Sequence, residues 1–87
     1  MSVLEQLYRL EMEFHRLTEA QSISELEAES IHTSYALQQG YEPLLRTVGV
    51  VDTASLAATK DRMAGLYGPR RAEAAFRFLR QLLPLSA

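Results

Sequence analysis

The chain has 87 residues, a formal net charge of −2 and no cysteine, which excludes disulfide bonds and thiolate metal sites. This length suits one small domain over residues 1–87, and small cores are often completed by oligomerisation. No apolar run approaches the roughly 20 residues needed to span a bilayer, and the first residues lack the pattern of a signal peptide. We therefore expect a cytoplasmic protein without a membrane-spanning segment.

The stretch Val3–Leu17 has the pattern of an amphipathic helix. Its apolar residues alternate spacings of four and three, which is typical of a helix that buries a narrow seam against another helix. The seam consists of Val3, Leu7, Leu10, Phe14 and Leu17. Because helix stability in proteins comes mostly from packing, this seam requires a partner surface.

A second helix is predicted from about Ser24 to Gln39, after a turn near residues 19–23. Ser24 and Glu27 have the spacing of a capping box, and Gly40 is a residue type at which helices commonly end. The two helices would then form an antiparallel hairpin.

One long helix is an alternative to this hairpin. No Gly or Pro stands between Met1 and Gln39, and the heptad begun at Val3 resumes in phase after two polar positions. The resumed positions are Ala28, Ile31 and Tyr35. We favour the hairpin because the predicted capping residues coincide with the polar interruption of the seam.

The next part of the chain is predicted to hold one short helix and one longer helix. Pro43–Val48 suits a turn of helix, and Val48–Val51 is expected to be a buried connector because no second strand candidate is present. Asp52 is a suitable N-cap for a helix over Thr53–Tyr67. The residues of that helix expected to be buried are Leu56, Met63, Leu66 and Tyr67.

Gly68 and Pro69 mark the clearest boundary in the sequence, since glycine commonly ends a helix and proline commonly starts one. The last helix is predicted from Pro69 to about Leu83, just before Pro84. Its two neighbouring apolar stripes are Ala72, Phe76, Leu79 and Leu83, and Ala74, Phe78 and Leu82. This face is wider than that of a typical surface helix, so the helix is either central or packs on another chain.

The charges divide unevenly between the two halves of the chain. Residues 1–42 hold eight acidic and two basic residues, whereas residues 43–87 hold three acidic and seven basic residues. Such asymmetry bears on partners more than on fold. We expect the basic half to face an acidic protein surface, whether that of residues 1–42, of a second copy or of another protein.

Carboxylate and imidazole side chains coincide in the first two helices. Antiparallel pairing would place Glu11 level with His32, and His15 level with Glu29. In a two-fold dimer, Glu11, Glu29 and His32 would supply the ligand types of a di-iron site in a helical bundle. Because Glu-x-x-His spacing is common in Glu-rich helices, a metal-binding dimer is an alternative only, and we expect no metal and no cofactor.

Other classes of site find less support in the sequence. The last helix carries arginines that could contact phosphates in a helix-turn-helix, but it is too apolar for a recognition helix, and the acidic half would repel nucleic acid. No glycine-flanked serine and no phosphate-binding glycine loop is present. We therefore expect no enzyme and no small-molecule substrate, and a nucleic-acid-binding regulator is the second alternative.

The sequence thus predicts an all-α bundle of two long N-terminal helices and a C-terminal helical hairpin, completed by oligomerisation. The predicted function is protein–protein interaction, as a regulator, adaptor or chaperone-like subunit that binds itself or another protein. The residues expected to face the partner are Val3, Leu7, Leu10, Phe14, Leu17, Arg77, Phe78, Arg80 and Leu82.

Overall fold

The computed structural model describes residues 2–19, 21 and 23–86, without the side chain of Glu25. Within this part of the chain, the helices are α1 (Val3–Glu19), α2 (Glu25–Gln38), α3 (Tyr41–Val48), α4 (Thr53–Tyr67) and α5 (Pro69–Leu82). Two short strands, β1 (Val51–Asp52) and β2 (Leu85–Ser86), pair in parallel. The predicted all-α class is confirmed.

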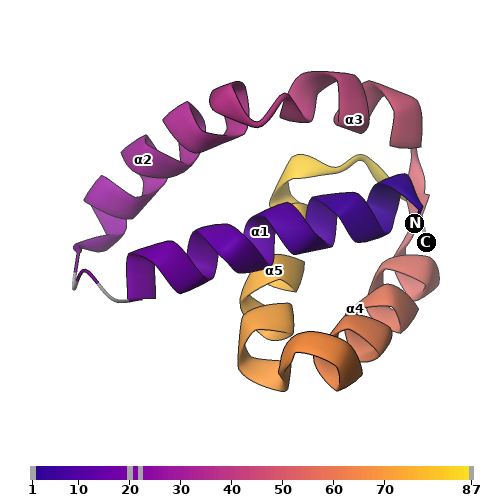
Figure 1. Ribbon diagram of the computed structural model, residues 1–87. Coiled ribbons are helices and arrows are strands. Elements are labelled where there is room, and N and C mark those ends of the chain that lie inside the picture. Colours follow the sequence, from indigo (N-terminus) through magenta and orange to yellow (C-terminus); the bar gives the residue numbers. More distant parts are fainter. Residues whose placement is uncertain (1, 20, 22, 87) are drawn as a thin grey trace.

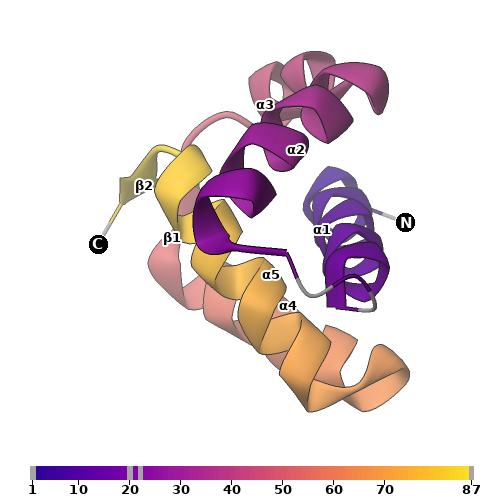
Figure 2. The same cartoon turned by 90° about the vertical axis from the view of Figure 1, so that its left-hand side faces the viewer.

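Helix α1 lies at the centre of the fold. Figure 1 shows α2 and α3 following each other in an arc on one side of α1, with α4 and α5 on the other side. Figure 2, seen from the left of that view, shows that α2 also approaches α5. The helix at the centre is therefore packed from two directions, and α2 lies at the outside of the molecule.

Local capping residues set the ends of the helices. The Ser24 hydroxyl accepts a hydrogen bond from the Glu27 amide at 3.2 Å, and the Asp52 carboxylate accepts one from the Ala54 amide at 2.7 Å. Gly40 has a φ of 70°, a left-handed conformation that ends α2 and starts α3. Because α1 ends before α2 begins, the predicted hairpin is confirmed and the single long helix is wrong.

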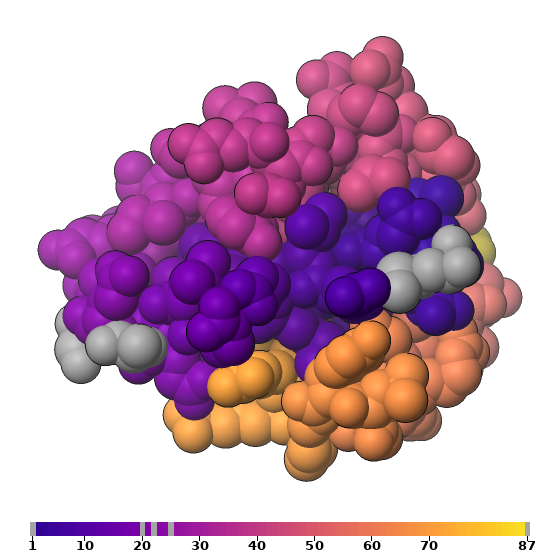
Figure 3. All heavy atoms as spheres, in the orientation of Figure 1, coloured from indigo at the N-terminus to yellow at the C-terminus, as the bar shows by residue number. Residues whose placement is uncertain are grey.

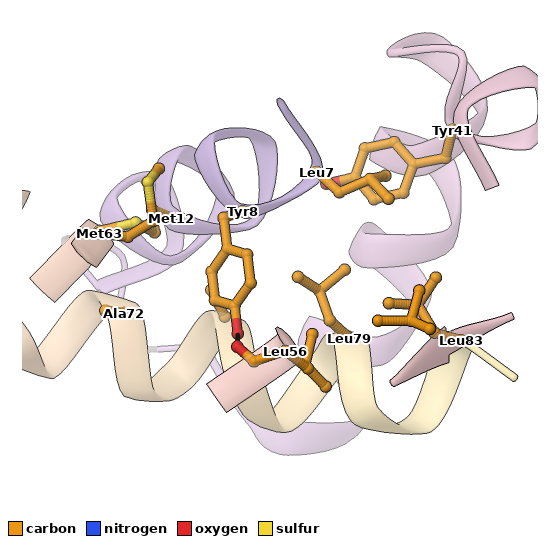
Figure 4. Close-up of a cluster of buried hydrophobic side chains, with 11 residues drawn as sticks. Leu7, Tyr8, Met12, Tyr41, Leu56, Met63, Ala72, Leu79 and Leu83 are labelled. Atoms are coloured by element: carbon orange, nitrogen blue, oxygen red, sulfur yellow. Dashed lines mark hydrogen bonds between the residues drawn. The ribbon is translucent and has the colours of Figure 1, made fainter. Parts of the chain in front are cut away.

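The core joins α1 to the helical pair α4 and α5. Leu7, Tyr8, Leu56 and Leu79 are completely buried, and the Tyr8 hydroxyl donates a hydrogen bond to the Leu56 carbonyl at 2.7 Å (Figure 4). Burial raises the pKa of the Tyr8 phenol, with smaller contributions from Glu73 and Asp61. The Tyr8 hydroxyl thus remains protonated and connects α1 to the first turn of α4.

The buried face of α1 is wider than the predicted seam. Leu7 and Phe14 are buried as predicted, but Leu17 is 40% exposed. Tyr8, Glu11 and Met12, which lie off the seam, are buried as well. The physical reason is that α1 is covered from two sides, so its buried surface extends around the helix beyond one stripe.

Several predicted burial assignments in the second half are also corrected. Leu66 and Tyr67 are exposed because the core contacts of α4 end with Met63 and the partly buried Ala64, one turn before Gly68. In the predicted buried connector, Val50 is exposed. Val51, although buried, pairs with Leu85 in the short sheet, a contact between segments distant in sequence.

The stripes of α5 are divided between core and surface. Ala72, Leu79 and Leu83 are buried as predicted, and Ala75, which belonged to neither predicted stripe, is buried too. Phe78 is partly buried, and Leu82 is exposed at the end of the helix. The first stripe therefore belongs to the core. The second stripe lies on the side of α5 where Phe78 contacts α2.

Phe14 and Leu17 belong to the same sequence seam but differ in burial, which gives a direct test of the packing. Phe14→Ala should reduce the free energy of unfolding by about 3–5 kcal/mol because it removes a buried aromatic ring. Leu17→Ala should reduce it by less than about 1 kcal/mol, because this side chain lies at the surface of the fold and is 40% exposed. Urea unfolding followed by circular dichroism measures both, and equal losses would contradict the two-sided burial of α1.

Candidate functional site

A buried pair of titratable side chains connects α1 to α2. The Nε2 atom of His32 lies 2.8 and 2.9 Å from the two carboxylate oxygens of Glu11. Glu11 is completely buried and His32 nearly so. The antiparallel pairing that predicted Glu11 level with His32 is confirmed, and this contact fixes the register between the two helices.

Aromatic rings surround the His32 imidazole. It stacks on Phe78 of α5 at a centroid distance of 4.8 Å and an interplanar angle of 8°. Phe14 of α1 contacts the imidazole edge-on, also at 4.8 Å, and Tyr41 of α3 does so at 6.1 Å. The imidazole therefore joins residues from α1, α3 and α5, which are far apart in sequence.

Two tyrosines complete this cluster. The Tyr35 hydroxyl donates a hydrogen bond to the Leu10 carbonyl at 3.1 Å. The buried Tyr41 hydroxyl has no hydrogen-bond partner among the described residues. Burial, and then the nearby Glu11 carboxylate, raise the pKa of Tyr41. Tyr41 thus stays protonated beside the Glu11–His32 pair, and the cluster contains a neutral hydroxyl next to a carboxylate.

A groove of about 360 Å³ opens beside this cluster, between α2, α3 and the end of α5. His32 and Tyr41 form part of its lining, and the rest is mostly apolar. The other apolar lining residues are Ala36, Leu37, Pro43, Leu45 and Leu82. The buried cluster is therefore the floor of a surface groove with an apolar rim.

Both leucines of α2 point away from the core. Leu26 is 79% exposed and Leu37 is 75% exposed, although the inner side of the same helix carries His32 and Tyr35. With Ser30 and Thr33, both exposed, the two leucines occupy positions spaced by four, three and four residues. We call Leu26, Ser30, Thr33 and Leu37 the outer seam of α2. This spacing is typical of a helix that packs against another helix.

A second and larger hollow, of about 700 Å³, runs along the face shown in Figure 3, where α1 is visible between the other helices. Three arginines line it, Arg9, Arg16 and Arg71. Arg16 forms an ion pair with Glu13 and lowers the pKa of that carboxyl, chiefly through the hydrogen bond between them. Arg9 lies over the Tyr67 ring, so these cations already have partners within the chain.

The fold buries some of the residues that were predicted to face a partner and leaves others exposed. Leu7 and Phe14 are buried within their own chain, and Val3 and Leu10 are partly buried against the core. Leu17 and Leu82 are exposed. On α5, Arg77 pairs with Glu73 of its own helix, Arg80 lies over the Phe76 ring, and Phe78 stacks on His32.

The two oppositely charged halves of the chain contact each other. Arg62 lies 3.3 Å from Glu5, and Arg70 and Arg71 lie 3.1 and 3.8 Å from Glu19. The basic half thus faces acidic residues of the same chain at these points, which is one of the three predicted arrangements. Because these pairs are exposed, they orient the helices more than they stabilise them.

The metal-ligand set proposed from the sequence is assembled only in part. Glu11 meets His32, but Glu29 is exposed on α2, and His15 lies 3.9 Å from Glu19 of its own helix. Among the described residues, no group of three or more His, Asp or Glu side chains could hold a metal ion.

The sequence predicted the Glu11–His32 contact but missed the outer seam of α2. The spacing of the outer-seam residues is present in the sequence. It can be recognised as a surface that faces away from the core only when the residues on the inner face of α2 are known. No family model matches the chain, and comparisons with characterised proteins and with solved structures give no match. Among the described helices, none has the length and apolar character required to cross a membrane.

A double-mutant cycle tests the buried pair. Glu11→Leu or His32→Leu alone should each cost about 3–5 kcal/mol of unfolding free energy, because each leaves a buried polar partner unpaired. The double variant should cost at least about 1 kcal/mol less than the sum of the two. Chemical denaturation of the four proteins measures this coupling.

The half-exposed pair His15 and Glu19 is the matched control for this cycle. Its atoms are 3.9 Å apart, so its coupling should stay below about 1 kcal/mol. Additive losses at Glu11 and His32 would show that the buried pair is not a coupled unit.

Proposed function

We propose that this chain is a small non-enzymatic interaction module that binds a protein partner through α2 and the groove beside it. The observation that carries the proposal is the exposure of Leu26 and Leu37 on a helix whose inner face is already fixed. Exposed leucines aligned along one helix at spacings typical of helix packing mark a surface that another protein covers.

The groove beside α2 supports the same proposal. Its rim includes Leu37 from the outer seam, Leu45 from α3 and Leu82 from α5, so three helices contribute apolar surface to one depression. A pocket of this kind can accept an apolar side chain of a partner, and such anchors supply most of the affinity in protein interfaces.

The charges near α2 favour a protein over a nucleic acid as the partner. Residues 17–45 contain five acidic residues and no Lys or Arg. Of the arginines in the other half, Arg70 and Arg71 are engaged with Glu19, and Arg46 lies 3.8 Å from Glu42. A phosphate backbone would be repelled by this segment, whereas a protein surface can match it.

Affinity capture with matched variants tests the proposal. The tagged chain should retain a specific protein, either a differently tagged second copy or another protein of the source cells. Leu26→Gln combined with Leu37→Gln should abolish this retention, because glutamine keeps the charge and the helix propensity but loses the apolar contact. Mass spectrometry of the captured proteins measures the difference.

Leu66→Gln is the control for this experiment, because Leu66 is 70% exposed but lies on α4, away from the groove. Circular dichroism establishes that all variants keep their helix content. If the seam variant captures the same proteins as the parent chain, or if the parent chain captures none, the proposed function is wrong.

A further inference from the structure

We infer that the partner seated on the outer seam of α2 is the α2 helix of a second copy of this chain, packed antiparallel about a two-fold axis. This inference rests on the proposed function and names its partner. It follows from the order of residues along the seam, from the distribution of charge along α2 and from the position of the groove.

The outer seam is complementary to itself when it is reversed. Its order is Leu26, Ser30, Thr33 and Leu37, with large residues at both ends and small ones in the middle. An antiparallel pair of such helices places Leu26 of one copy opposite Leu37 of the other, twice. Ser30 then lies opposite Thr33 at the centre, where small residues allow the helix axes to approach closely.

The Thr33 hydroxyl does not oppose burial at this centre. It donates a hydrogen bond to the Glu29 carbonyl of its own helix at 3.1 Å, so it needs no partner from outside. Covering Thr33 with a second helix therefore leaves this hydroxyl satisfied.

The charges of α2 select the antiparallel direction. Its three acidic residues, Glu25, Glu27 and Glu29, all belong to the first half of the helix, and its second half has no acidic residue. In the antiparallel register these acids lie opposite Gln38, Ala36 and Ser34 of the other copy. A parallel pair would instead bring the like charges together, which is unfavourable.

The surface beyond the C-terminal end of α2 carries a basic residue that can attract the acidic residues of the second copy's α2. Figure 1 shows α3 continuing the arc past the end of α2, and α3 carries Arg46, the first basic residue after Arg16. The acidic end of the second copy's α2 is directed toward this part of the surface. Arg46 is largely exposed, with Glu42 3.8 Å away, and can turn to the incoming acids.

The groove gives Leu26 of the second copy a place to enter. Leu37, its predicted neighbour, forms part of the groove rim together with Leu45 and Leu82. A leucine that packs beside Leu37 is thus surrounded by apolar side chains from three helices, which is the knob-into-hole contact of paired helices. The two-fold axis forms this contact twice.

Cysteine cross-linking after mixing of two variants tests the orientation, since the chain has no cysteine of its own. Leu26→Cys and Leu37→Cys are purified separately and oxidised either alone or as an equal mixture. The antiparallel pair predicts that the mixture forms far more disulfide-linked dimer than either variant alone. A parallel pair predicts the opposite, because each variant would then link to itself, and that result overturns the inference.

Light scattering of the unmodified chain tests the occupant independently. We expect a concentration-dependent dimer whose dissociation constant rises at least about tenfold in Leu37→Gln, because the two-fold axis places each change in the interface twice. Leu66→Gln should leave the constant unchanged. A chain that remains monomeric up to near-millimolar concentration overturns the inference. In that case, capture of another protein through the same seam would leave the proposed function standing.

Discussion

The contact between the Glu11 carboxylate and the His32 imidazole is the constraint on which the arrangement of the helices depends. A buried carboxylate that loses its partner costs several kcal/mol, so α2 can neither slide nor rotate on α1 without breaking the contact at 2.8 Å. Stacking of the imidazole on Phe78 holds α5 to the same point. Because the inner face of α2 is fixed in this way, Leu26 and Leu37 must face outward.

Helix α1 contributes to the core on two sides, because other helices cover it from two directions. Tyr8 donates a hydrogen bond to Leu56 of α4, and Phe14 packs against His32 and Tyr35 of α2. A chain of this length has little apolar area to bury, and using both sides of its central helix increases that area. The polar Glu11 lies among these buried residues, where an apolar side chain would be expected, and its pairing with His32 compensates for its burial.

The sequence predicted features that are encoded locally far better than features set by packing. The bounds of α4 and the caps at Ser24 and Asp52 followed from residues within a few positions of each helix end. Burial of Met12 and exposure of Leu17 could not be read from one stripe, because they depend on how the other helices cover α1. The Glu11–His32 contact was predictable because it needs only the register of a hairpin, whereas its aromatic surroundings come from α3 and α5.

Helix α2 reverses the usual placement of side chains, with a histidine inside and both leucines outside. A buried pair of polar groups contributes specificity of register more than stability, since an apolar pair of similar volume would hold the helices at least as well. Leucines left in water contribute nothing to the fold of one chain but supply affinity when a second helix covers them. The two faces of α2 therefore serve different ends: the inner face sets where the helix lies, and that position determines which surface the outer face presents to a partner.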